Sequence, residues 1–125
     1  MTSDAAVRLV SGMATDASTL PLAHEPVPAD QVVAGAPTTG SAVLDAGAAE
    51  AAAPEIGVWE MTPGTMRDVE ADEVFVVLSG DATVEFTDPP GPPVELGPGS
   101  VLRLDAGMRT VWTVRGTLRK VYLAP

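Results

Sequence analysis

Lys120 is the only lysine in this chain of 125 residues, and it stands two positions before Tyr122 near the carboxyl end. Residues two apart on a β-strand point to the same side, so these two side chains are expected to share one face. A lysine used once, inside a strand, indicates a specific position for a positive charge, and Glu60 is its candidate partner. The alternative is a strand-edge lysine whose ammonium group lies in solvent.

Two further faces carry residues that could contact a ligand. Glu73 begins an apolar run and shares its side of the strand with Phe75, while Thr110 shares a side with Trp112. A partly buried glutamate can act as a general base when burial and a neighbouring cation set its pKa. Trp112 is interpreted as a core residue, with a stacking wall for a ligand as the alternative.

Other polar groups are interpreted as structural. The acids Asp68, Glu70 and Asp72 lack the ligand spacing of a calcium loop, so we read them as a solvated rim. The segment 79–81 (SGD) has no histidine nearby that could activate its serine, and it is predicted to be a hairpin turn. His24, the single histidine, is interpreted as a surface or capping residue. Cysteine is absent, which excludes disulfides and thiolate chemistry.

The elements that would position these residues are short, β-rich and separated by glycine and proline turns. This pattern predicts an antiparallel sandwich or barrel. The run 73–78 (EVFVVL) is apolar enough that both of its faces should be covered. The loop 88–93 (DPPGPP) is expected to stay outside the ladder, and 46–54 to form an exposed connection. Strands are predicted at 31–34, 41–45, 56–62, 73–78, 82–87, 94–96, 100–104, 110–114 and 118–123.

The chain length corresponds to one domain. Residues 1–20 are predicted to form a flexible N-terminal arm whose removal costs little stability, and residues 21–125 the folded domain. The first residues lack the basic and apolar regions of a signal peptide, and no apolar run could span a bilayer. We therefore expect a cytoplasmic protein.

Charge restricts the partners. Seventeen acids against seven bases give a formal net charge of −10, so this is an acidic protein. Such a surface repels nucleic acid and anionic membranes, and we expect neither as a partner. The expected partners are a small molecule and a second copy of the chain, because the outer face of the 73–78 strand would otherwise be left exposed.

Two glycine-bounded segments resemble the paired motifs of the cupin superfamily. The first is 64–80 (GTMRDVEADEVFVVLSG) and the second is 99–107 (GSVLRLDAG). More narrowly, 57–64 (GVWEMTPG) and 118–122 (LRKVY) are similar to the ureidoglycine aminohydrolase and ethanolamine-utilisation cupins. The likeness covers about residues 30–124. It implies a double-stranded β-helix, the jelly-roll barrel of cupins, over residues 21–125.

The resemblance also implies where a cupin metal would bind, and this chain departs from the pattern there. By position, Arg67 and Val69 replace two histidine ligands, Glu73 retains the carboxylate, and Thr110 replaces the last histidine. A guanidinium and a valine cannot ligate a cation, so we predict no metal and no cofactor. Arg67 would then replace the metal charge and pair with Glu73 inside the barrel.

Three functions remain open, and the residues do not decide whether the protein is an enzyme. The first is a metal-independent cupin that binds a small polar metabolite, with a carboxylated one among the options. The second is an isomerase, cyclase or lyase, and the third is a dimeric accessory or regulatory protein with a vestigial pocket. The candidate catalytic residues are Glu73, Arg67 and Lys120, and the candidate ligand-binding residues are Arg67, Glu60, Phe75, Thr110, Trp112 and Tyr122.

Overall fold

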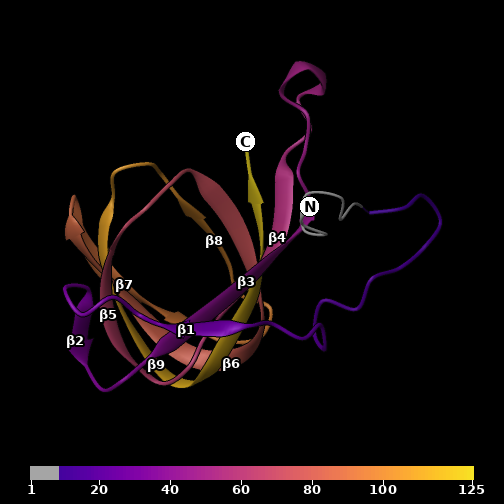
Figure 1. The fold of residues 1–125 in the computed structure, drawn as a ribbon. Coiled ribbons are helices and arrows are strands. Elements are labelled where there is room, and N and C mark those ends of the chain that lie inside the picture. Colours follow the sequence, from indigo (N-terminus) through magenta and orange to yellow (C-terminus); the bar gives the residue numbers. More distant parts are fainter. Residues whose placement is uncertain (1–8) are drawn as a thin grey trace.

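A computed structural model describes residues 9–125, and these form one strongly curled antiparallel sheet (Figure 1). The only helical turn in this part of the chain is the 3-10 turn η2 at Ala49–Ala51. The strands are β1 His24–Pro26, β2 Val32–Ala34, β3 Thr38–Asp45, β4 Glu55–Met61, β5 Gly64–Val69, β6 Glu73–Asp88, β7 Pro90–Leu96, β8 Val101–Leu104 and β9 Arg109–Ala124.

Two long strands, β6 and β9, organise the sheet. They pair with each other along most of their length, from Val74 opposite Leu123 to Asp88 opposite Arg109. The first part of β9 also pairs with β5, and its last part pairs with β4. β7 and β8 both pair with β6. Because β6 and β9 each contact different neighbours at their two ends, the sheet curls around a single interior.

That interior is a packed apolar core. Alternate residues of β4, β6 and β9 point inward, as the two-residue period of a strand requires. The largest side chains that are fully buried there are Trp112, Phe75, Met61, Leu104 and Leu118. They belong to one cluster of buried hydrophobic residues. The expected all-β fold is therefore confirmed, with its core inside the curled sheet.

The segment 79–81, predicted to be a hairpin turn, is a bend within the continuous strand β6. The register against β9 shifts on both sides of Ser79, which marks a bulge. Gly80 has φ of +107°, and a Cβ on it would collide with the backbone of Thr117 and Leu118. The expected break at 115–117 is likewise absent, because β9 runs through it. These glycine segments bend strands instead of ending them.

The prediction that the loop 88–93 stays outside the sheet is wrong in part. β7 begins at Pro90, so part of the DPPGPP loop does join the ladder. This is possible because β7 pairs only with β6, and an edge strand tolerates residues without a backbone donor. Two strands, β1 and β5, were not predicted at all, and β3 begins at Thr38 instead of residue 41.

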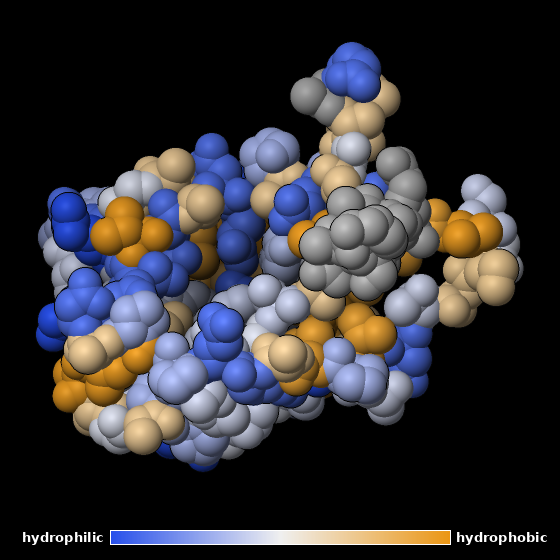
Figure 2. Space-filling view, viewed as in Figure 1, coloured by the Kyte–Doolittle hydropathy of each residue, from blue (hydrophilic) through white to orange (hydrophobic). Residues whose placement is uncertain are grey.

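The exterior is mostly hydrophilic in the view of Figure 2, with hydrophobic residues in separate patches. The β3–β4 connection extends away from the barrel (Figure 1), as expected of an exposed connection. No helix within residues 9–125 has the length and apolar character needed to cross a membrane.

The end of the N-terminal arm contacts the outside of the barrel. Arg119 is buried, and its Nη1 donates to the backbone oxygens of Ala17 (2.9 Å) and Leu20 (2.8 Å). Its Nε donates to Glu60 Oε1 at 3.0 Å. Residues 17–20 thus supply two of the acceptors that a buried guanidinium requires.

These contacts change the expectation for truncation. Deleting residues 1–20 should lower the unfolding free energy by about 1–3 kcal/mol relative to deleting residues 1–15, because a buried donor group loses both carbonyl acceptors. Urea unfolding of the two truncated proteins measures the difference. Equal stabilities would show that water replaces the two carbonyls without cost.

Candidate functional site

A small polar cavity lies inside the barrel, between β4, β5, β6 and β9. Its volume is about 190 Å³. The cavity is notable for holding three carboxyl groups, one ammonium group and both tryptophans of the chain. The residues that line it are Ser41, Trp59, Asp68, Glu70, Glu73, Trp112, Lys120 and Tyr122.

Lys120 is the one cation lining this cavity, and it is 5% exposed. Its Nζ donates to Glu73 Oε2 at 2.7 Å. The same Nζ lies over three rings, 4.2 Å from the centroid of Phe75, 4.7 Å from Trp59 and 5.0 Å from Trp112. Ring faces attract a cation within about 6 Å, so the ammonium is held by one carboxylate and an aromatic cage.

Register explains why these groups meet. Lys120 lies opposite Trp59 on β4 and opposite Val77 on β6, and Glu73 and Phe75 share the inward side of β6 with Val77. The sequence-based expectation that Lys120 occupies a specific position is therefore correct, whereas a solvent-exposed lysine is excluded.

Glu70 is the most deeply buried acid of the cavity, with 9% of its surface exposed. Its Oε2 accepts hydrogen bonds from Thr110 Oγ1 (2.5 Å) and Trp112 Nε1 (2.9 Å). These two donors compensate for the loss of hydration of the carboxylate. Thr110 and Trp112 therefore act on the site through Glu70, and Trp112 also supplies a wall of the cavity, so it is both core and lining.

Asp68 is the cavity acid that lacks a strong partner. The one hydrogen bond recorded for its carboxylate comes from the backbone N–H of Val69, at 2.8 Å. Burial, reinforced by the negative charge of Glu70, raises the pKa of Asp68 to about 6, although the Val69 hydrogen bond and Lys120 act in the opposite direction. An acid with this pKa changes its charge close to neutral pH.

Tyr122 closes the cavity on the side of β4. Its hydroxyl donates to Glu55 Oε2 at 2.8 Å. Burial and this hydrogen bond raise the pKa of Tyr122, so the phenol stays protonated. The ring covers Gly57, where any Cβ would collide with it. Gly57 is thus required for the close approach of the ring and not for its backbone conformation.

The predicted pair between Arg67 and Glu73 does not form. Arg67 is exposed on the outer side of β5, and its Nη1 donates to the backbone oxygen of Asp30 at 3.2 Å. Met66 and Asp68, its neighbours in sequence, face inward instead. A shift of one residue in a strand reverses every side chain, so assigning Arg67 and Val69 to inward positions exchanged the two faces of β5. Lys120 holds the place beside Glu73 that was assigned to Arg67.

Glu60 is not the partner of Lys120. It lies opposite Arg119 on the outer face, and it accepts hydrogen bonds from Arg119 Nε (3.0 Å) and His24 Nε2 (2.6 Å). Burial would raise the pKa of Glu60, but these two hydrogen bonds outweigh it and lower the pKa. His24 also contacts Thr38 Oγ1 through Nδ1, so the lone histidine belongs to a structural network.

The solvated-rim interpretation holds only for Asp72, which is exposed and accepts from the N–H of Ala106. Asp68 and Glu70 face the cavity and were missed as site residues. The alternation of Met66, Asp68 and Glu70 would have identified them, had 64–69 been recognised as a strand.

The cavity does not fit a metal ion. Glu73 is engaged with the ammonium of Lys120, and Glu70 accepts from two neutral donors. Among residues 9–125, no group of three or more histidine, cysteine or acidic side chains is arranged to hold a metal.

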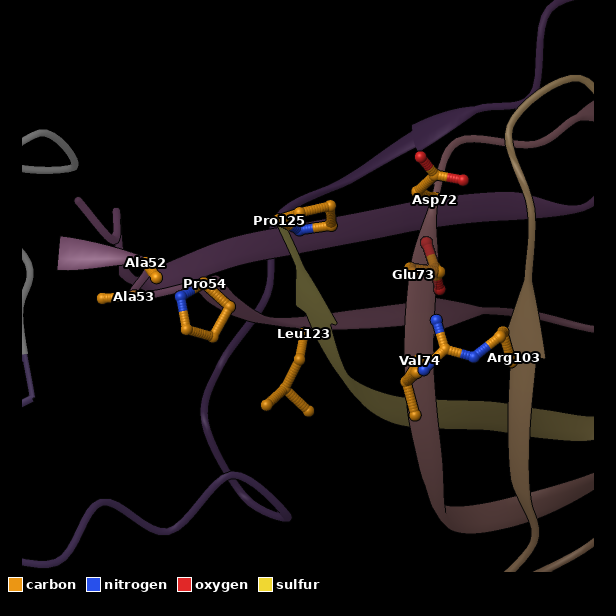
Figure 3. A pocket seen from close by; sticks show the side chains of 9 residues that line it. All are labelled: Ala52, Ala53, Pro54, Asp72, Glu73, Val74, Arg103, Leu123 and Pro125. Carbon is orange, nitrogen blue, oxygen red and sulfur yellow. The ribbon is translucent and has the colours of Figure 1, made fainter. Parts of the chain in front are cut away.

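A larger groove, of about 730 Å³, lies beside the end of β9 (Figure 3). Ala52, Ala53 and Pro54 lie on one side of it and Asp72, Glu73, Val74 and Arg103 on the other, with Leu123 and Pro125 between them. Glu73 borders both this groove and the inner cavity. The walls are mostly apolar, so the groove differs chemically from the cavity.

Together, the curled all-β sheet and the inward-facing site on its long strands define a cupin-type barrel. The model of the EutQ-like cupin domain matches residues 48–122, and the chain belongs to this family. The predicted cupin fold and subfamily are thereby confirmed. A comparison with curated proteins finds no match.

Solved structures agree at the level of the fold. A DUF861-family protein from Pseudomonas syringae pv. tomato is 22% identical with a TM-score of 0.69; the match covers 88% of this chain but 46% of that one. EutQ from Clostridium difficile is 19% identical, with a TM-score of 0.58 and coverage of 81% and 80%. Ectoine synthase from P. lautus is 16% identical, with a TM-score of 0.56 and coverage of 70% and 64%.

The Lys120–Glu73 pair gives a direct test of the site. Lys120→Met or Glu73→Gln alone should destabilise the protein by about 3–5 kcal/mol, because each leaves a buried partner uncompensated. The double variant should recover most of that loss. Urea unfolding of the four proteins gives the coupling energy, and Arg67→Met, on the exposed face, should change stability by about 0.5 kcal/mol or less. Additive losses in the double variant would contradict the pairing.

Proposed function

We propose that this protein is a metal-independent cupin that binds a small polar molecule inside its barrel, and that the ligand carries a cationic or hydrogen-bond-donating nitrogen group. The observation that carries the proposal is Asp68, a half-buried carboxylate that faces the cavity without a cationic partner. Burial and the negative charge of Glu70 raise its pKa. A bound ammonium or amide N–H would supply the missing partner.

The charge balance of the cavity supports this ligand class. Asp68, Glu70 and Glu73 are opposed only by Lys120, which is engaged with Glu73. A carboxylated ligand would add a further negative charge to this set and would be repelled. Of the polar metabolites considered from the sequence, a cationic or neutral one is therefore favoured over a carboxylate.

The volume restricts the size of the ligand. A cavity of about 190 Å³ corresponds to roughly six water molecules at ~30 Å³ each. Trp59 and Trp112 provide apolar walls, with their ring centroids 5.8 Å apart. The ligand is thus a compact molecule of a few heavy atoms, with its nitrogen toward the acids and its carbon skeleton against the indoles.

Metal independence follows from the same groups. The ammonium of Lys120 provides the positive charge beside Glu73 that a bound cation would otherwise bring. Two of the three cavity carboxylates are engaged, Glu73 with Lys120 and Glu70 with Thr110 and Trp112, and the remaining one, Asp68, provides too few ligands for a metal site. The ligand is therefore bound by the side chains themselves.

A second candidate is an acid–base enzyme of the isomerase, cyclase or lyase type, favoured by the pKa of Asp68. A group with a pKa of about 6 can accept and return a proton near neutral pH. Lys120 beside it would stabilise negative charge developing on the substrate. Arg67 has no part in this version, because its guanidinium lies outside the barrel. The polar cavity speaks against the third option, a vestigial pocket.

Fluorescence tests the ligand class, because both tryptophans of the chain line the cavity. Propylammonium should change the emission and bind more tightly than propionamide, and propionate should not bind. Binding should strengthen as pH rises through about 6, since ionised Asp68 attracts the cation and protonated Asp68 does not. Asp68→Asn should weaken binding at least about tenfold.

Asp105→Asn, in the exposed β8–β9 turn, is the matched control and should bind as the wild type does. Metal content measured by elemental analysis on the same sample should be substoichiometric. Preferential binding of propionate, or one tightly held transition metal per chain, would overturn the proposal.

We further propose that the protein is a homodimer that uses the outer face of β6 and β8. Val74 and Val76 on this face are only half-buried, and they lie opposite Leu123 and Val101, which are 37% and 65% exposed. The apolar groove of Figure 3 adjoins them through Val74 and Leu123. Arg103, which lies opposite Val74 on β8, is the charged residue among them. Exposed apolar residues gathered on one face are typical of a protein interface.

Light scattering at tens of micromolar (~10–50 µM) should give the mass of two chains, and Val101→Glu should shift it to one chain, because a charge enters the apolar contact. Val33→Glu places the same charge on exposed β2 and should leave the dimer intact. A monomeric wild type would refute this interface.

A further inference from the structure

A second pocket, on the outside of the barrel, collects two of the arginines of this acidic protein. It has a volume of about 330 Å³ and includes Arg67 on β5 and Arg109 on β9. It lies on the opposite side of β5 from the inward-facing Met66. The other residues that line it are Asp30, Gln31, Asp68, Val69, Thr87, Thr110 and Val111.

The register of β5 and β9 explains how the pocket is built. Arg67 lies opposite Val111, and Val69 lies opposite Arg109. The two arginines therefore occupy one diagonal of a four-residue square, whose diagonal residues are about 7–8 Å apart, and two valines occupy the other. Long guanidinium side chains at that separation can reach one small anion between them, with the valines beneath it.

Two of the other arginines are paired with carboxylates, whereas Arg67 and Arg109, like Arg103, form no such pair within the described residues. Arg115 pairs with Asp81 and Glu95, and Arg119 pairs with Glu60. Within residues 9–125, Arg67 and Arg109 form no ion pair with a carboxylate, although the protein has seventeen acids. Two positive charges without a carboxylate partner thus line a single pocket.

One of the two is held in place by the chain. The backbone N–H of Arg67 donates to the oxygen of Gln31 at 2.8 Å, and its Nη1 donates to the oxygen of Asp30 at 3.2 Å. Asp68 lines this pocket as well as the barrel cavity, and its carboxylate accepts from the backbone N–H of Val69 and forms no ion pair with either arginine. Holding a guanidinium with a carbonyl orients it while leaving its charge available.

We infer that this outer pocket binds a phosphate monoester of a small, partly apolar molecule. Two guanidinium groups can each form paired hydrogen bonds with the oxygens of one phosphate dianion, and Val69 and Val111 supply an apolar contact for the attached group. The two arginines lie on the opposite face of the sheet from Lys120, and although Asp68 lines both pockets, this site does not depend on the function proposed for the cavity.

Titration of the ¹⁵N-labelled full chain with phenyl phosphate tests the site. The amide resonances of Arg67 and Val111 should shift and saturate, and inorganic phosphate should bind more weakly because it lacks the ring. Arg67→Gln and Arg109→Gln should each weaken phenyl phosphate binding at least about tenfold. Asp30→Asn, which removes a nearby negative charge but keeps the carbonyl, should strengthen it up to about fivefold.

Arg103→Gln is the matched control, because Arg103 is also an exposed arginine on a strand but lies outside this pocket. It should leave binding unchanged. Absence of saturable shifts up to ~10 mM phenyl phosphate, which corresponds to negligible affinity, would overturn the inference. So would equal weakening by Arg103→Gln, and so would tighter binding of phenylacetate, which carries a single charge.

Discussion

The contact between the ammonium of Lys120 and the carboxylate of Glu73 is the interaction on which the interior depends. It places both charges of a 2.7 Å pair inside the barrel, against the cluster of buried hydrophobic residues. Removing two such groups from water is costly, and their attraction alone does not assure a net gain. The three surrounding rings contribute further attraction for the cation. The packing of Trp59, Phe75 and Trp112 is thus coupled to the charge at their centre.

The constraint extends to the rest of the cavity. Since Lys120 is engaged with Glu73, it cannot also neutralise Asp68 and Glu70. Glu70 is compensated by two neutral donors from β9, whereas Asp68 has one backbone donor and a raised pKa. Burying this carboxylate without a cationic partner is unfavourable, and a cationic ligand would offset that cost. Binding and stability therefore oppose each other at Asp68, as is common where a site is built for a partner.

The fold could be predicted from the sequence because its signals are local. Apolar alternation and glycine turns indicate strands, and the spacing of glycine-bounded motifs indicates the barrel. Strand continuity could not be predicted at 79–81 and 115–117, because a glycine that bends a strand and a glycine that ends one look alike. The difference lies in pairing with distant partners. Pro90 joined the ladder for a similar reason, since only the topology makes β7 an edge.

The site could be predicted only where local sequence signals determine it. The face shared by Glu73 and Phe75, and the one shared by Lys120 and Tyr122, were correct because alternation within one strand needs no long-range information. Which glutamate meets Lys120 depends on register between strands, and Glu60 was the wrong choice because it lies opposite Arg119. On β5 the two faces themselves were exchanged, because Arg67 and Val69 were assigned to the inner face, which Met66 and Asp68 occupy.

The parity of β5 has a consequence for the whole barrel wall. Met66, Asp68 and Glu70 face inward, while Arg67 and Val69 face outward. The segment 66–70 therefore has its acids on the inner face and its base on the outer face. Arg67 is thus not available to neutralise the buried carboxylates of its own segment. On the outer face, the adjoining strand β9 adds a second base, Arg109, near Arg67. On the inner face, the other end of β9 contributes Lys120, which neutralises Glu73. Side chains on opposite faces of a strand point away from each other, so Arg67 cannot pair with Asp68 or Glu70 across the sheet. The charges on each face are therefore balanced by residues of another element or by a bound molecule.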